Sequence, residues 1–151
     1  MTTLCTTMDL FGLRSTSVGV STEATEVQDW VRQSFEHYLE PRLQLLLPEI
    51  QDAVSEEGSR VDAGTIRAAE LFAYCLPRFG PLPEVSVDPD GEISFDWIEP
   101  SGSKMFSVSV NNQNRLAYAG WFGEKSRIHG IEQLAENCPP EILRGIQKAT
   151  L

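Results

Sequence analysis

The feature that most constrains this chain is a change in the spacing of its apolar residues after residue 77. Before that point apolar residues recur every three or four positions, which is the period of an amphipathic helix. After the proline-rich stretch 77–83 they alternate with polar residues, which is the period of a β-strand. Helical stripes and the apolar face of a sheet must be buried against each other, so the sequence predicts an α+β fold.

Three helices are expected in the N-terminal half, over residues 23–77. The first ends at Pro41, because proline lacks an amide donor and restricts the residue before it. The second extends to Gly58, although Pro48 lies inside its apolar pattern. The third begins at Asp62, whose carboxylate is placed to cap the amides of the first helical turn. Residues 1–22 show no clear period, and a flexible arm is expected there.

Four short strands are expected over residues 84–122, joined by turns with characteristic residues. Proline presets one turn dihedral, and glycine or asparagine adopts the positive one, at Asp88–Gly91, Glu99–Gly102 and Asn111–Asn114. Connections this short force antiparallel hairpins, so the strands form a meander. The alternating apolar residues of the four strands are Val85 and Val87; Ile93, Phe95 and Trp97; Phe106, Val108 and Val110; and Leu116, Tyr118 and Phe122.

A C-terminal helix is expected over residues 139–149, packed on the sheet. Pro139 and Pro140 suit a first helical turn, and Glu141 is favourable at the positive end of the helix dipole. At 151 residues the chain is the size of one domain, so residues 23–151 are predicted to form a single α+β unit.

Targeting signals and cysteine usage favour a cytoplasmic protein. The first 22 residues contain one basic residue and no apolar core of a secretory signal, and no apolar run is long enough to cross a membrane. The three cysteines form no C-x-x-C pair, as is usual in a reducing compartment.

The net charge of −10 is unevenly distributed along the chain. Residues 23–60 carry nine acidic and three basic side chains, whereas residues 103–151 carry four acidic and six basic ones. An acidic body argues against direct nucleic-acid binding, since affinity for nucleic acids comes largely from phosphate neutralisation. It favours a basic partner protein or mimicry of a polyanion, with a solubilising surface as the simpler interpretation.

Motifs for metal, nucleotide and catalysis fail on spacing, so no metal, cofactor or catalytic residue is predicted. The acidic run from Asp88 resembles a calcium loop, but its sixth position, where that loop needs glycine, is Ile93. The segment from Gly120 lacks the glycine–lysine step of a phosphate loop, because Glu124 intervenes after Gly123. No metal-binding histidine or cysteine spacing and no nucleophile elbow occurs.

The best candidate for a binding site is the segment after the fourth strand. Its predicted binding residues are Trp121, Lys125, Ser126, Arg127 and His129. Basic donors and a hydroxyl so close together suit a carboxylate, a phosphate or an acidic surface, and tryptophan often anchors interfaces. The alternative is a loop leaving the sheet, in which Arg127 pairs with an acid of the helices. A second alternative is a small enzyme that uses Arg127, His129 and Cys138.

Four segments of the chain together resemble a group of small uncharacterised bacterial proteins. They are Leu82–Trp97, Phe106–Val110, Leu116–Gly120 and Ser126–Gly130, and the resemblance covers residues 60–148. The group is associated with mobile or variable gene neighbourhoods, which implies an accessory or defence-related binding protein. The resemblance supplies no catalytic residues.

The sequence therefore predicts a non-enzymatic protein that binds another protein, in the manner of an antitoxin, immunity protein or inhibitor. The partner is expected to be basic. A small enzyme or ligand-binding domain built on residues 125–129, and an acidic DNA-mimic inhibitor, stay open as alternatives. Oligomeric state is left open by the sequence.

Overall fold

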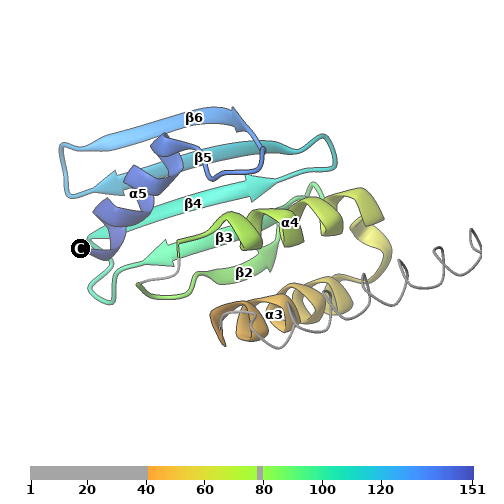
Figure 1. The fold of residues 1–151 in the computed structure, drawn as a ribbon. Coiled ribbons are helices and arrows are strands. Elements are labelled where there is room, and N and C mark those ends of the chain that lie inside the picture. Colours follow the sequence, from red (N-terminus) through yellow and green to blue (C-terminus); the bar gives the residue numbers. More distant parts are fainter. Residues whose placement is uncertain (1–40, 78–79) are drawn as a thin grey trace, which may run out of the picture. The chain divides into compact units, whose positions relative to one another are not determined.

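The sheet contains five antiparallel strands that lie side by side in the order in which they occur in the chain. The computed structural model describes residues 41–77 and 80–151 (Figure 1). The strands are β2 (Glu84–Val87), β3 (Ile93–Ile98), β4 (Lys104–Val110), β5 (Arg115–Phe122) and β6 (Arg127–Gln133). The four predicted strands are confirmed as a meander. The prediction of only four is wrong, because β6 extends the sheet beyond residue 122.

The three predicted turns close their hairpins as the sequence indicates. In each, the amide of the fourth residue donates to the carbonyl of the first: Gly91 to Asp88 at 2.9 Å, Gly102 to Glu99 at 2.7 Å, and Asn114 to Asn111 at 3.2 Å. All three donor residues have positive φ, between 58° and 87°. Glycine and asparagine tolerate this conformation best, which explains why they occur at these positions.

Three α-helices occur in residues 41–77 and 80–151. In Figure 1, α4 and α5 lie over one face of the sheet, and α3 lies along β2 and contacts α4. They are α3 (Pro41–Glu57), α4 (Ala63–Cys75) and α5 (Pro140–Thr150), with a short 3-10 turn at Gly58–Arg60 between the first two. In this part of the chain two helices, not three, precede the sheet. The first predicted helix and the arm over 1–22 fall outside the described residues.

Helix α4 begins with the predicted cap. The Asp62 carboxylate accepts a hydrogen bond from the Thr65 amide at 3.0 Å. Its second oxygen accepts one from the Asn112 side chain at 2.9 Å, which ties the start of α4 to the β4–β5 turn. The Thr65 amide, followed by the weaker contributions of Asn112 and other donors, lowers the pKa of Asp62.

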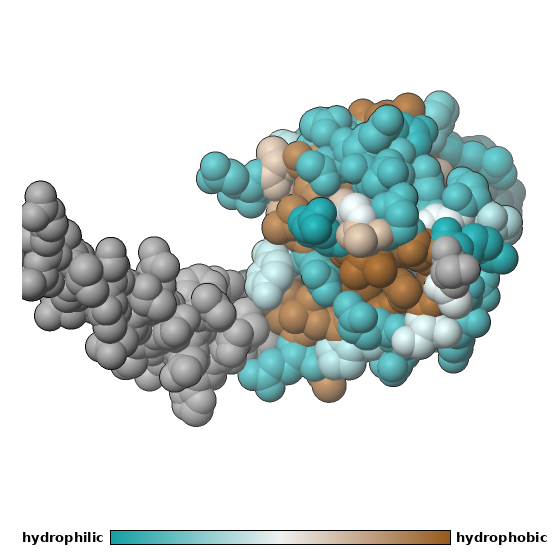
Figure 2. Space-filling model, turned by 90° about the vertical axis from the view of Figure 1, so that its right-hand side faces the viewer, coloured by the Kyte–Doolittle hydropathy of each residue, from teal (hydrophilic) through white to brown (hydrophobic). Residues whose placement is uncertain are grey.

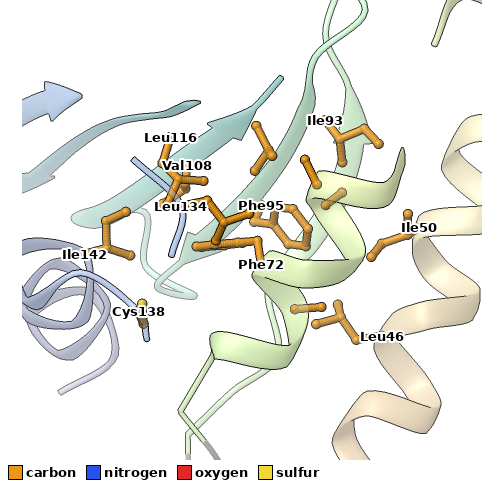
Figure 3. Packing of buried hydrophobic residues seen from close by; sticks show 14 of the residues in the cluster. Leu46, Ile50, Phe72, Ile93, Phe95, Val108, Leu116, Leu134, Cys138 and Ile142 are labelled. Carbon is orange, nitrogen blue, oxygen red and sulfur yellow. The ribbon is translucent and has the colours of Figure 1, made fainter. Parts of the chain in front are cut away.

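Residues 40–151 form one compact unit whose core lies between the helices and one face of the sheet. Figure 3 shows Leu46 and Ile50 of α3, Phe72 of α4 and Ile142 beside the sheet residues. Phe72 meets Phe95 edge to face, with ring centroids 5.0 Å apart. Burial of each such side chain stabilises the fold by about 1.5–3 kcal/mol, which offsets the helix-breaking tendency of Pro48 inside α3.

Helix α5 is seated directly on an aromatic ring of β4. Phe106 is fully buried and contacts Tyr118 edge to face, with centroids 5.8 Å apart. Gly145 faces this ring, and a Cβ atom there would lie 2.3–2.4 Å from three ring atoms. The absence of a side chain at Gly145 therefore sets how closely α5 approaches the sheet.

The surface in Figure 2 is mostly hydrophilic and is interrupted by apolar patches. The large apolar side chains that are most exposed are Leu45, Leu71, Tyr74, Leu82, Ile98, Trp121, Ile131 and Leu151. Among the described helices, none is long and apolar enough to cross a membrane.

Candidate functional site

The predicted binding segment forms a hairpin and not a loop that leaves the sheet. Trp121 is the second-last residue of β5 and lies directly opposite Arg127, the first residue of β6. His129 lies two residues further along β6, opposite Ala119, and therefore on the same face. Arg127 has no ion-pair partner among the described residues, so the pairing with a helix acid in the alternative interpretation is not found there.

Lys125 and Ser126 occupy the turn between β5 and β6. The Phe122 amide donates to the Ser126 carbonyl at 2.8 Å, and Gly123 takes a positive φ of 88°. The Lys125 side chain is exposed at the tip of this turn. The structure thus brings Trp121, Arg127 and His129 together on one face, with Lys125 and Ser126 at its end.

These residues belong to a sheet face that none of the three described helices covers (Figure 1), which we call the outer face. Core residues occupy alternate positions of β3, β4 and β5, so the residues between them, and the residues paired with these on β2 and β6, lie on the opposite face. The outer face consists of Glu84 and Ser86; Ser94, Asp96 and Ile98; Met105, Ser107 and Ser109; Arg115, Ala117, Ala119 and Trp121; and Arg127, His129, Ile131 and Gln133.

A polar cluster lies on the outer face beside the β2–β3 turn. The Asp88 carboxylate accepts hydrogen bonds from the hydroxyls of Ser94 at 2.6 Å and Ser109 at 3.0 Å. Burial raises the pKa of the nearby Asp96, and the Asp88 and Glu84 carboxylates raise it further, against a lowering hydrogen bond from a serine. Negative charge is therefore crowded at this side of the face.

A second feature, on another surface, is a groove between α3 and the edge of β2 that pairs with no strand of residues 41–77 and 80–151. Its volume is about 250 Å³. It is lined by Glu49, Asp52, Ala53, Glu56 and Glu57 of α3 and by Val85, Ser86 and Val87 of β2. We call it the acidic groove. Most small-molecule pockets have roughly 300–1,000 Å³, so this one suits a few protein side chains better than a cofactor.

The carboxylates of the acidic groove are only partly neutralised. Glu57 pairs with Arg60 at the end of α3. Glu49, Asp52 and Glu56 follow the three-and-four spacing of one helix face, and no cation within the described residues pairs with them. Like charges at this spacing repel each other, and a bound cation would relieve that repulsion.

The edge of β2 adds backbone groups to the same groove. The Asp88 amide donates to the Glu92 carbonyl at 2.8 Å, so these residues form a hydrogen-bonded pair at the hairpin end. Hydrogen-bonded and non-hydrogen-bonded pairs alternate along an antiparallel ladder. The backbone N–H and C=O groups of Val85 and Val87 therefore point away from β3 and toward the groove.

A metal ion is not required by the carboxylates of the β2–β3 turn. Ligand oxygens of Asp88, Asp90 and Glu92 lie within 4.8 Å of one another. Each already has a protein partner: Asp88 its two serines, Asp90 the Glu92 amide at 3.1 Å, and Glu92 the Arg115 guanidinium at 3.5 Å. These contacts explain the cluster as hairpin structure.

The structure does not bring together the cysteine and histidine of the enzyme alternative. Cys138 belongs to the core on the helix side of the sheet, whereas His129 is exposed on the outer face. Burial, and to a lesser degree the Cys75 thiol, raises the pKa of Cys138 to about 12. A thiol with so high a pKa is protonated at neutral pH and is a poor nucleophile.

Sequence reasoning missed both β6 and the acidic groove. The excess of acidic residues over 23–60 is apparent in the sequence. The sequence does not show that α3 presents Glu49, Asp52 and Glu56 to the edge of a strand. Their spacing of three and four is the signal that predicts a shared helix face. The strand that completes the groove lies about 30 residues later, and sequence periodicity does not show this packing.

Comparisons with known proteins add no relative. No protein-family model matches the chain, and neither a curated protein nor a solved structure matches it.

Proposed function

We propose that this chain is a non-enzymatic interaction domain that binds a positively charged, extended segment of another protein in the acidic groove. The observation that carries the proposal is the position of three carboxylates without a described cation partner, Glu49, Asp52 and Glu56, beside an edge of β2 that pairs with no strand in the described part of the chain.

Charge supports a basic ligand. The groove gathers negative charge from one face of α3 in a protein whose net charge is −10. Long-range attraction of this kind accelerates encounter with a cationic partner and selects against acidic ones. Lysine or arginine ammonium and guanidinium groups are the natural partners of clustered carboxylates in proteins.

Backbone geometry supports an extended ligand. An incoming strand can pair with the outward N–H and C=O groups of Val85 and Val87, as in recognition by β-strand addition. Alternate side chains of that strand then point toward α3, where basic residues meet Asp52 and Glu56. Pairing supplies affinity and the carboxylates supply selectivity.

The test uses a short peptide in which lysine alternates with valine, and a matched peptide with glutamate in place of lysine. Amide chemical shifts of the isotopically labelled full chain are recorded at low ionic strength. The lysine peptide is expected to shift the amides of Val85 and Val87 and to lose affinity as salt is added. The glutamate peptide is expected to cause no shift.

Two double variants separate the groove from general acidity. Asp52→Lys with Glu56→Lys removes the carboxylates of the groove and should abolish binding. Glu124→Lys with Glu136→Lys makes the same change in net charge at exposed sites that do not line the groove, and binding should persist. Equal binding by both variants would contradict the groove. Shifts spread over every acidic surface would instead favour polyanion mimicry.

The predicted binding role of Trp121, Lys125, Ser126, Arg127 and His129 stays a prediction. These residues lie on the outer face and its terminal turn, and none of them lines the acidic groove. A charge-reversal variant at Lys125 and Arg127 in the same peptide assay would show whether they contribute to this binding.

A further inference from the structure

The outer face combines exposed apolar side chains with a centre of small residues. Ile98, Trp121 and Ile131 are 48%, 44% and 62% exposed. Apart from Asp96 and Met105, the central strands carry short side chains on this face: Ser94, Ser107, Ser109, Ala117 and Ala119. With few long side chains on its central strands, this face can be approached closely by another flat surface.

Charge is divided across the outer face from one edge of the sheet to the other. Glu84 and Asp96 lie opposite each other on β2 and β3. Arg127 and His129 lie on β6. The register places Glu84, Asp96, Ser107, Ala119 and His129 in one continuous row across all five strands. One end of this row is acidic and the other end is His129, with Arg127 two residues away on the same strand and face.

We propose that two copies of this chain stack through their outer faces, around a two-fold axis that runs parallel to the strands over β4. This rotation places β6 of each copy over β2 of the other. It places the cross-strand row of one copy over the same row of the other copy in reverse order, so that His129 faces the partner's Glu84. The proposal goes beyond the binding function of the acidic groove and does not depend on it.

The apolar residues match under the same rotation. Ile98, Met105 and Trp121 occupy one row on β3, β4 and β5. Reversing this row places Trp121 over the partner's Ile98 and Met105 over the partner's Met105. Sheets stacked face to face keep their strand directions within about 30°, so the match is closest near β4. The interface then has this apolar row beside the row that runs from Glu84 to His129. The small residues Ser94, Ser109 and Ala117 form the next row.

The other two-fold axis available to stacked sheets is perpendicular to the strands, and charge disfavours it. That rotation places each strand over its own copy, so the Glu84 and Asp96 side of one face meets the same side of the other. Arg127 and His129 would likewise meet their own basic side. Like charges brought together in an interface repel each other and weaken association.

The size of the face indicates a weak and reversible dimer. With strands about 4.8 Å apart and a rise of about 3.3 Å per residue, the face covers about 500 Å² per copy, or about 1,000 Å² for the pair. Specific interfaces bury at least about 1,000 Å² in total. The dimer is therefore expected to dissociate on dilution.

Sedimentation of the full chain over a concentration series, from micromolar to millimolar, measures this equilibrium. The wild-type protein is expected to shift from monomer to dimer. Trp121→Ala should raise the Kd at least tenfold, as expected for a buried aromatic anchor. Tyr74→Ala is the matched control, because Tyr74 is 50% exposed on α4 and lies away from the outer face. Its Kd should equal that of the wild type.

A charge exchange within one chain identifies the axis. His129→Glu alone places a carboxylate over the partner's Glu84 and should weaken the dimer. Glu84→Lys alone should also weaken it, beside the partner's basic strand. The double variant pairs the new glutamate with the partner's new lysine twice, so dimerisation should return. Around the perpendicular axis the same double variant would bring like charges together and stay weak.

Three results would overturn the proposal. The first is a monomer at every concentration. The second is a dimer whose Kd does not change in Trp121→Ala, which would place the contact on another surface such as the free edge of β6. The third is a double charge variant that stays as weak as its single parents. Circular dichroism of each variant verifies that the fold is retained.

Discussion

Gly145→Ala is predicted to destabilise the protein although alanine is the better helix former. In an exposed helix interior, glycine to alanine stabilises by about 1 kcal/mol. Here the new Cβ would lie 2.3–2.4 Å from atoms of the Phe106 ring, whereas carbon atoms in contact prefer about 3.5–4.0 Å. Either the ring or α5 must move by more than about 1 Å.

The ring has little room to move, because Phe106 is fully buried against Trp97 and Tyr118. Overpacking of this kind costs about 1–3 kcal/mol, and we place this site at the upper end since the whole helix must lift. After the helix propensity is subtracted, the net loss is about 2 kcal/mol.

Urea unfolding of the full chain, followed by circular dichroism, measures this loss. With a slope of about 2 kcal/mol per molar urea, the midpoint should fall by roughly 1 M. Phe106→Leu provides the second arm of a double-mutant cycle, because a smaller side chain makes room for the Cβ. In the Gly145→Ala background this substitution should cost less than in the wild type. A midpoint that rises in Gly145→Ala would refute the packing argument.

Three further predictions concern titratable groups. The pKa of Asp62 is lowered in the folded state, first by the Thr65 amide. The stabilisation from its carboxylate is therefore present above the unfolded pKa of about 3.9 and is lost as pH falls through the folded pKa. In urea titrations at several pH values, Asp62→Ala should lower the unfolding midpoint at pH 7 and have a smaller effect below that window. The pKa of Asp96 is raised, first by burial, so the folded state binds more protons than the unfolded state, and stability falls as pH rises through the window above about 3.9. Asp96→Asn should be more stable than the wild type at pH 7 and equally stable in acid. A variant that is less stable than the wild type at pH 7 would contradict this. Burial raises the pKa of Cys138 to about 12, so a thiol reagent at pH 8 should modify Cys138 slowly in the native protein and rapidly in urea; fast native labelling, located by mass spectrometry, would count against it.

Local sequence signals predicted the elements whose stability depends on local contacts. The cap of α4 follows from the placement of Asp62 before an apolar stripe, and the structure confirms its bond to Thr65. The hairpins follow from glycine or asparagine at the position of positive φ. The C-terminal helix was expected over 139–149 and occupies Pro140–Thr150.

Strand β6 escaped prediction because one of its inward positions is filled from a neighbouring strand. A half-buried strand usually shows apolar residues at alternate positions. In β6 the central position facing the helices is Gly130, and a Cβ there would lie 2.5 Å from the Tyr118 hydroxyl. The Tyr118 side chain supplies the bulk that residue 130 lacks, so the apolar pattern of β6 is interrupted in the sequence.

The candidate sites were only partly accessible to sequence analysis for a related reason. Trp121, Arg127 and His129 are close in sequence, and hairpin pairing is enough to place them on one face. The acidic groove and the charge division of the outer face join segments that are far apart in the chain. The geometry of the groove depends on how α3 packs beside β2, which apolar spacing does not specify. The charge division depends on the register of the strands, and β6 was not predicted.

The strict order of strands in the sheet has a consequence for how this chain folds during synthesis. Each strand pairs with the one made just before it, so every ladder contact has a small sequence separation and a low entropic cost of loop closure. Folding rates rise as contacts become more local, and domains acquire structure progressively as they leave the ribosome. The meander can therefore form one hairpin at a time while translation proceeds. Of the described elements, helix α5 is synthesised last. Until it packs on the sheet, the apolar face around Phe106 stays exposed, and chaperones are expected to bind there.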